Sequence, residues 1–209
     1  MTRAERAALL RGIYVIVNES ADSVPLAAAV LAGGARIIQY RAKSGIDRKN
    51  AIALRDLTRS HSALFIINDD WRAALDFEAD GVHVGPDDAS VESLVSIRNA
   101  LSHLVMGVSC GTADEARSAA KADADYLGVG SVFTTESKED AGPPIGLAGL
   151  RDVGAATCLP LAAIGGITRE RIADVRGAGA AMAAVISAVA RQADPEAATR
   201  DLVRSWNAS

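Results

Sequence analysis

Eight short apolar runs, separated by longer amphipathic stretches, recur along the whole chain and constrain its fold more than any other feature. Each run has four or five residues and is apolar at nearly every position, as is typical of a strand buried on both faces. The expected strands are Ile13–Val17, Ile37–Tyr40, Leu64–Ile67, Gly81–Val84, Val105–Val108, Tyr126–Val129, Leu161–Ile164 and Met182–Ile186. This alternation predicts an α/β protein built around a parallel sheet.

The stretches between these runs show helical periodicity. The clearest are Lys49–Ser60, Val91–Leu101, Ala113–Ala122, Arg169–Ala178 and Pro195–Trp206. Thr112 and Thr168 stand where N-caps are expected, and Pro195 suits a first helical turn. Eight strands that alternate with helices predict a (β/α)₈ barrel, also called a TIM barrel. The alternative is an open, doubly wound sheet, for which five or six strands would be expected.

The chain length implies one compact domain over residues 1–209. Eight units in 209 residues leave about 26 residues for each, and a typical barrel has roughly 250 in all, so short helices and minimal loops are expected. No polar or proline-rich stretch offers a linker. One connection is long, from Gly130 to Gly146, and such a loop is typical of an active-site lid or a mobile segment.

Composition excludes several classes of protein. Of the residues, 49% are hydrophobic and 23% are charged, a composition typical of globular proteins. The net charge of −4 argues against nucleic-acid binding. No apolar stretch is long enough for a membrane span, and the charged N-terminus does not resemble a signal peptide. Cys110 and Cys158 form no metal or redox motif. We therefore expect a cytoplasmic protein. The same features are compatible with a homo-oligomer.

The active site of such a barrel lies at the carboxyl ends of its strands. The polar residues and glycines near the ends of the apolar runs or directly after them are Gln39, Arg41, Lys43, Asn68, Asp69, His83, Asp88, Ser109, Thr135, Ser137, Lys138, Gly165, Gly166 and Ser187.

Asp69 and Asp88 follow neighbouring strands, so both carboxylates would reach the same part of the barrel mouth. Two hard oxygen ligands with open positions left over suit Mg²⁺ carrying a phosphate. The sequence also allows simpler interpretations of these residues. Either Asp69 or Asp70 could cap the short helix at Trp71, and Asp88 could be a surface turn residue.

Arg41 and Lys43 stand two residues apart at a strand end and can point the same way. Together with Gln39 they would suit a diphosphate, although a solvated strand edge is the alternative.

Gly165, Gly166 and Ser187 follow the last two strands, where this fold usually binds phosphate. Ser187 could instead be only an N-cap, and Lys138 could be an ordinary loop residue. His83 is expected to be a hydrogen-bonded strand residue rather than a base. The two cysteines lack histidine and acid partners, so nucleophilic catalysis is not expected.

Six motifs resemble, in order and spacing, those of the thiamine phosphate synthase family of small (β/α)₈ enzymes. They are QYRAK, IINDD, ADGVHVGPDD, GVSC, ADYLGVGSVFTTESK and AIGGIT. The similarity extends from IYVIVN at residue 13 to AAVISAV at residue 183.

The resemblance implies a transferase that joins 4-amino-5-hydroxymethyl-2-methylpyrimidine diphosphate to 4-methyl-5-(2-phosphoethyl)thiazole and releases diphosphate. By motif position, Mg²⁺ would be held by Asp69 and Asp88. The pyrimidine diphosphate would be bound by Gln39, Arg41, Lys43, Asn68, Ser109 and Lys138, of which Arg41, Lys43, Ser109 and Lys138 would act in catalysis. The thiazole phosphate would be bound by Thr135, Ser137, Gly166, Ile186 and Ser187.

Two other functions are compatible with the resemblance. One is a thiazole tautomerase of the same superfamily, which uses a histidine shortly after the serine of the fifth strand and lacks the paired carboxylates. Here that position reads Ser109-Cys110-Gly111. The other is a binder of thiamine phosphate without catalytic activity, against which the presence of Lys138 argues.

Overall fold

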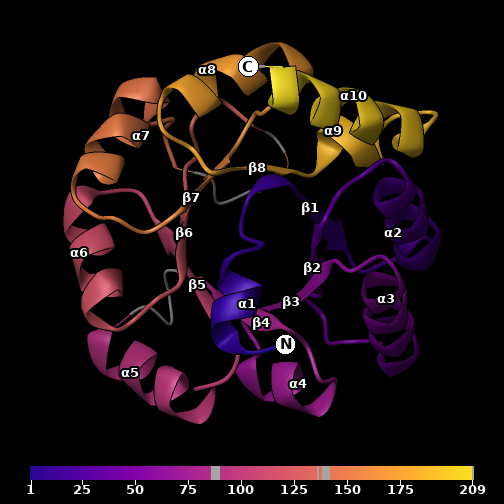
Figure 1. Cartoon of the computed structure of the whole chain (residues 1–209), viewed down its shortest axis with the longest axis horizontal. Helices are drawn as coiled ribbons and strands as arrows, with labels where there is room; N and C mark the ends of the chain where they lie inside the picture. Colours follow the sequence, from indigo (N-terminus) through magenta and orange to yellow (C-terminus); the bar gives the residue numbers. More distant parts are fainter. Residues whose placement is uncertain (86–89, 136, 138–141, 209) are drawn as a thin grey trace.

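A computed structural model shows a closed barrel of eight parallel strands, which confirms the expected (β/α)₈ fold (Figure 1). The structure describes residues 1–85, 90–135, 137 and 142–208. The strands are β1 (Gly12–Asn18), β2 (Ile37–Arg41), β3 (Leu64–Asn68), β4 (Gly81–Val84), β5 (Val105–Cys110), β6 (Tyr126–Val129), β7 (Leu161–Ile164) and β8 (Met182–Val185). Strand β1 pairs in parallel with both β2 and β8, and this pairing closes the ring.

Helices alternate with the strands and surround them (Figure 1). They are α1 (Arg3–Ala7), α2 (Ser23–Ala32), α3 (Arg48–Ser60), α4 (Trp71–Asp76), α5 (Val91–Ala100), α6 (Ala113–Lys121), α7 (Gly146–Ala155), η2 (Arg169–Arg171), α8 (Ile172–Gly177), α9 (Ser187–Ala190) and α10 (Pro195–Ala208). Thr112 caps α6 as expected: its hydroxyl accepts the Glu115 N–H, and the Glu115 carboxylate accepts the Thr112 N–H.

The expected helical stretch Arg169–Ala178 is helical in the structure but consists of two parts. The chain first makes a 3₁₀ turn over Arg169–Arg171, and α8 begins only at Ile172. Thr168 occupies the N-cap position of that turn, but its side chain makes no capping hydrogen bond. The tighter 3₁₀ geometry is common at helix starts.

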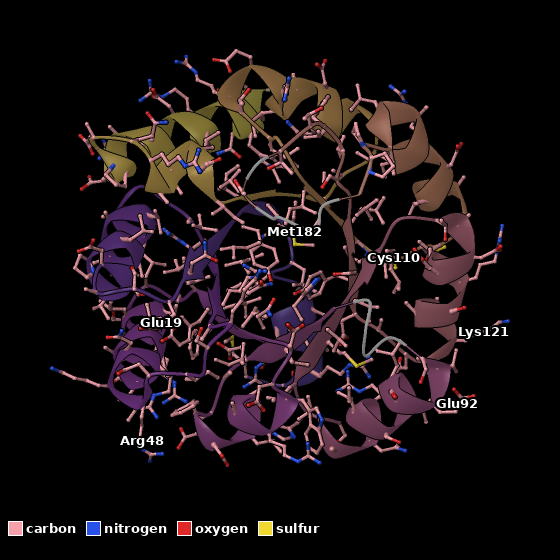
Figure 2. The ribbon with its side chains drawn as sticks, turned by 180° about the vertical axis from the view of Figure 1, so that it is seen from behind. Glu19, Arg48, Glu92, Cys110, Lys121 and Met182 are labelled. Atoms are coloured by element: carbon pink, nitrogen blue, oxygen red, sulfur yellow. The ribbon has the colours of Figure 1, made fainter. Side chains whose placement is uncertain are left out.

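Side chains alternate between two apolar layers, because successive strand residues point to opposite faces. The layer inside the ring contains Tyr14, Ile16, Ile37, Leu64, Ile66, Val105, Tyr126, Ala162, Met182 and Ala184. The layer between strands and helices is larger and includes Cys110. Figure 2 shows both positions, with Met182 within the ring of strands and Cys110 on the side of α6.

The same alternation directs the polar residues at the strand ends. Gln39 follows the inward-facing Ile37 by two residues, Asn68 follows Ile66 by two, and Ser109 follows Val105 by four. These three side chains therefore face the inside of the barrel at its carboxyl end.

Helix α1 lies over the opposite end of the barrel, on the side of β4 and β5 (Figure 1). Arg3 of α1 pairs with Asp123 and Asp125, and Arg6 pairs with Asp80. These ion pairs hold α1 against the segments that precede β4 and β6. No helix in the described part of the chain is long and apolar enough to span a membrane.

Candidate active site

A line of hydrogen bonds crosses the barrel interior and connects two of the expected site residues, Gln39 and Ser109. The Gln39 amide nitrogen donates to the Tyr14 hydroxyl at 2.7 Å, and the hydroxyls of Tyr14 and Tyr126 lie 2.9 Å apart. His83 Nδ1 lies 3.1 Å from the Tyr126 hydroxyl, and His83 Nε2 lies 3.1 Å from Ser109 Oγ. Strands β2, β1, β6, β4 and β5 each contribute one member. The expectation that His83 is a hydrogen-bonded strand residue is confirmed.

Two glycines make room for this line. A Cβ on Gly107 would lie 2.1 Å from the Tyr126 ring, and a Cβ on Gly128 would lie 2.7 Å from the His83 ring. Burial raises the pKa of both Tyr14 and Tyr126 well above the usual value. Both hydroxyls therefore keep their protons at neutral pH.

Asp69 and Asp70 have different structural roles, which separates two interpretations that the sequence left open. Asp70 is the N-cap of α4, and its carboxylate accepts the Ala73 N–H at 2.9 Å. Asp69 has a left-handed backbone with φ 61°, which turns its side chain away from the helix. Asp69 Oδ1 accepts the Gly85 N–H at 2.9 Å, and Oδ2 accepts from the Asn68 amide at 2.5 Å.

The Asp69 carboxylate is suitable as one of the two expected Mg²⁺ ligands. It is exposed at the barrel mouth, and each oxygen has lone-pair capacity beyond the one hydrogen bond it accepts. Gly85, which holds it, directly precedes the segment that contains Asp88, but Asp88 itself lies outside the described residues. Within the described ranges, no three acidic, histidine or cysteine side chains gather into a metal cluster.

The expected diphosphate cations lie beside this carboxylate edge. Arg41 is the last residue of β2, is half-buried, and donates weakly to Asn18 Oδ1 at 3.4 Å. Lys43 is exposed two residues further on. Neither cation takes part in a salt bridge among the described residues. Lys138, the third expected cation, lies outside the described part of the chain.

The residues expected at the thiazole phosphate gather on the other side of the mouth, after β6 and β8. Ser137 Oγ donates to Ser187 Oγ at 3.2 Å, and the Ser137 N–H donates to Thr135 Oγ1 at 3.2 Å. Ile186, expected to end β8, is instead the N-cap residue of α9. Ser187 is therefore the first residue of that helix, so the alternative of Ser187 as an N-cap is wrong.

Gly166 shapes the same side of the mouth through its backbone. It has φ 63°, and a Cβ there would lie 2.5 Å from the Thr134 carbonyl oxygen. Its own carbonyl accepts from Arg171 Nη1 at 2.7 Å, while the Arg171 guanidinium lies 4.3 Å from the centre of the Phe133 ring. Arg171 thus joins the segments that follow β6 and β7.

Neither cysteine is placed for chemistry. Both are free, with Cys158 exposed and Cys110 buried in the layer behind β5. Burial, with a smaller effect of Glu115, raises the pKa of the Cys110 thiol to about 12, which keeps it protonated and unreactive.

Sequence reasoning missed three residues of this region: Tyr14, Tyr126 and Arg171. Sequence reasoning treats the two tyrosines as apolar residues of buried strands. Their inward position could have indicated that their hydroxyls meet inside the barrel. Arg171 gave no signal, because its contact with Gly166 depends on the 3₁₀ turn between them.

Comparison with known proteins identifies the family. The family model described as thiamine monophosphate synthase matches residues 13–189. The chain belongs to the thiamine monophosphate synthase family. Among curated members, the thiamine-phosphate synthase of Moorella thermoacetica is 45% identical over 197 residues, which cover 91% of this chain and 93% of that protein. The thiamine-phosphate synthase of Methanoregula boonei is 47% identical over 197 residues, which cover 91% of this chain and 90% of that protein.

A solved structure supports the same assignment. The thiamine phosphate pyrophosphorylase of Pyrococcus furiosus superposes with a TM-score of 0.85 at 35% identity, covering 96% of this chain and 97% of that one. The resemblance seen in the six sequence motifs is therefore confirmed at the level of the family.

Proposed function

We propose that this member of the thiamine monophosphate synthase family condenses an aminopyrimidine diphosphate with a thiazole phosphate to give thiamine phosphate and diphosphate. The observation that carries the proposal is the two-sided mouth of the barrel. One side holds Gln39, Arg41, Asn68, Asp69 and Ser109, and the other holds Thr135, Ser137, Gly166 and Ser187. Two phosphorylated substrates need two such sides, and the named relatives are synthases of this kind.

The chemistry requires positioning and neutralisation of charge rather than a base. The bond between the pyrimidine methylene carbon and the diphosphate oxygen breaks, and its electron pair leaves with the diphosphate. The thiazole nitrogen donates its lone pair to the same carbon, so no proton moves. In this proposal Arg41, Lys43 and Lys138 neutralise the leaving diphosphate, and Asn68 and Ser109 help to hold the pyrimidine half.

Asp69 and Asp88 are the proposed ligands of Mg²⁺. When bound, the ion supplies further positive charge to the diphosphate oxygens. The Gly85 N–H and the Asn68 amide support this role for Asp69, since each fixes one oxygen of its carboxylate.

The thiazole phosphate is proposed to bind where Thr135, Ser137 and Ser187 meet, beside Gly166 and Ile186. Hydroxyls and backbone amides would carry this contact, because none of these residues is charged. The proposed compartment is the cytoplasm.

The direct test mixes both substrates with Mg²⁺ and the purified chain, and follows thiamine phosphate and diphosphate by chromatography. We expect both products in equal amounts, and no coupling after chelation of the metal. Binding of both substrates without product would indicate a binder without catalytic activity. Isomerisation of a thiazole carboxylate phosphate without coupling would indicate the tautomerase.

A further inference from the structure

In the line of hydrogen bonds from Gln39 to Ser109, each group donates a hydrogen bond to the next, so the line has one direction. We propose that Tyr14, Tyr126 and His83 are positioning residues that set Gln39 as an acceptor and Ser109 as a donor at the mouth, and so select an aminopyrimidine over its oxo analogue. The inference rests on the proposed function, because it concerns how that substrate's ring is recognised.

The direction follows from counting protons. The Gln39 amide N–H donates to the Tyr14 hydroxyl, so that oxygen acts as an acceptor there. Tyr14 is fully buried, and its hydroxyl oxygen has one other partner among the described residues, the Tyr126 hydroxyl. Its proton therefore points to Tyr126, because a buried donor without an acceptor would lose its hydrogen bond to water with no replacement.

The same reasoning applies at the next two links. Tyr126 accepts from Tyr14, so its own proton points to His83 Nδ1 at 3.1 Å. An accepting Nδ1 carries no proton, which leaves the ring proton of a neutral imidazole on Nε2. His83 Nε2 then donates to Ser109 Oγ at 3.1 Å, and the Ser109 hydroxyl proton is directed to the mouth.

The other end of the line is equally defined. Since Nε2 of the Gln39 amide is engaged with Tyr14, the free end of the amide is its oxygen. No donor among the described residues lies within hydrogen-bond distance of this oxygen. Gln39 is only 3% exposed, but its side chain faces the inside of the barrel near the carboxyl end of β2, so the amide oxygen is left to accept from a ligand bound at the mouth.

The mouth thus presents an acceptor on β2 and a donor on β5. An aminopyrimidine offers the complement, an amino group that donates and unprotonated ring nitrogens that accept. A 4-oxo analogue offers the reverse, an oxygen that accepts and a ring N–H that donates. Reversing the line to suit it would require rotation of a buried amide and transfer of the His83 proton to Nδ1.

The test removes one hydrogen-bonding hydroxyl from the line and keeps the packing of the barrel interior. Tyr14→Phe keeps the ring and removes the hydroxyl that orients Gln39. We expect the preference for the amino over the 4-oxo pyrimidine diphosphate, as a ratio of kcat/KM values, to fall by about tenfold or more. The KM for the thiazole phosphate should change less than about twofold, because its proposed contacts come from Thr135, Ser137 and Ser187. None of these three forms a hydrogen bond with Tyr14 or Gln39 among the described residues.

Tyr40→Phe is the matched control. Tyr40 is the neighbour of Gln39 in β2, is also fully buried, and has a hydroxyl without a hydrogen-bond partner in the described structure. Its loss should leave the substrate preference unchanged. An equal fall in kcat/KM for both analogues in Tyr14→Phe would indicate a purely structural role and overturn the proposal, as would an unchanged ratio.

A second measurement does not depend on activity. Nitrogen-15 NMR of the chain, which has three histidines, reports the tautomer of each imidazole. We expect His83 to carry its proton on Nε2. A proton on Nδ1, or a doubly protonated ring, would overturn the proposed direction. An inactive wild-type protein with the expected tautomer would instead count against the proposed function.

Discussion

Two adjacent carboxylates show how much a single backbone angle decides at the scale of the residue. Asp69 and Asp70 are chemically identical neighbours, yet the left-handed φ of Asp69 directs its side chain to the mouth, while Asp70 turns to cap α4. Aspartate and asparagine tolerate this backbone region better than most residues. The two roles can therefore be separated by substitution.

We expect Asp69→Asn to lower kcat by about 100-fold, because a neutral amide replaces a proposed metal ligand without adding backbone strain. Asp70→Ala should instead lower the free energy of unfolding by about 1 kcal/mol through loss of the cap, and leave kcat within about twofold. Steady-state kinetics over a range of Mg²⁺ concentrations and urea unfolding measure the two effects. A wild-type kcat in Asp69→Asn would remove Asp69 from the proposed metal site.

At the scale of the element, the polar line constrains which residues the strands can contain. Gly107 of β5 stands opposite Tyr126 of β6 in the register, and the tyrosine ring occupies the space that a side chain on Gly107 would need. Ring carbon and hydroxyl oxygen both lie within 2.5 Å of the Cβ position, and Tyr126 is fully buried. A Cβ on Gly107 would therefore overlap the ring, and either the ring or the strand would have to shift.

Gly107→Ala should therefore destabilise the fold by about 1–3 kcal/mol through overpacking. The control is Gly177→Ala at the end of α8, where nothing lies within 4 Å of the Cβ position. That change should stabilise by about 0.4–1 kcal/mol, because alanine has less freedom in the unfolded chain. Urea unfolding of both variants tests this. Equal stability of Gly107→Ala and wild type would mean that the Tyr126 ring can move.

The strands themselves were predictable, and their polar contacts were not. Apolarity at nearly every position marks a strand covered on both faces, and the count of eight favours a barrel over an open sheet. The side chains of β2, β3 and β5 that face the mouth follow from the period of two. The meeting of the Tyr14 and Tyr126 hydroxyls joins positions 112 residues apart, and no local pattern encodes that distance. The different roles of Asp69 and Asp70 depend on the backbone angle φ of Asp69, which the residue type alone does not specify.

At the scale of the whole molecule, the two ends of the barrel have separate tasks. The carboxyl end carries the candidate site, and the amino end carries a buried ionic cluster that attaches α1. Asp125 is central to this cluster. Its side chain is 7% exposed, pairs with Arg3 at 2.8 Å and with Arg98 at 3.0 Å, and accepts the Met106 N–H at 2.8 Å.

Asp125→Ala should cost about 3–5 kcal/mol, because it leaves the guanidinium of Arg98, 8% exposed, without its carboxylate. Asp201→Ala is the matched control. Asp201 also lies between two arginines, Arg169 and Arg204, but at 3.7 Å and with its side chain 42% exposed, so its loss should cost at most about 1 kcal/mol. Urea unfolding measures both. Similar losses in the two variants would contradict the role given to burial.

A double variant separates the lost attraction from the cost of an unpaired buried charge. If the unpaired charge dominates, replacing Arg98 by Met in the Asp125→Ala background should restore about 1 kcal/mol or more of the lost stability, although two ion pairs are then absent. If the attraction itself dominates, the double variant should be no more stable than Asp125→Ala. Below the unfolding transition both proteins should keep the wild-type kcat, because the cluster lies at the end of the barrel opposite the mouth.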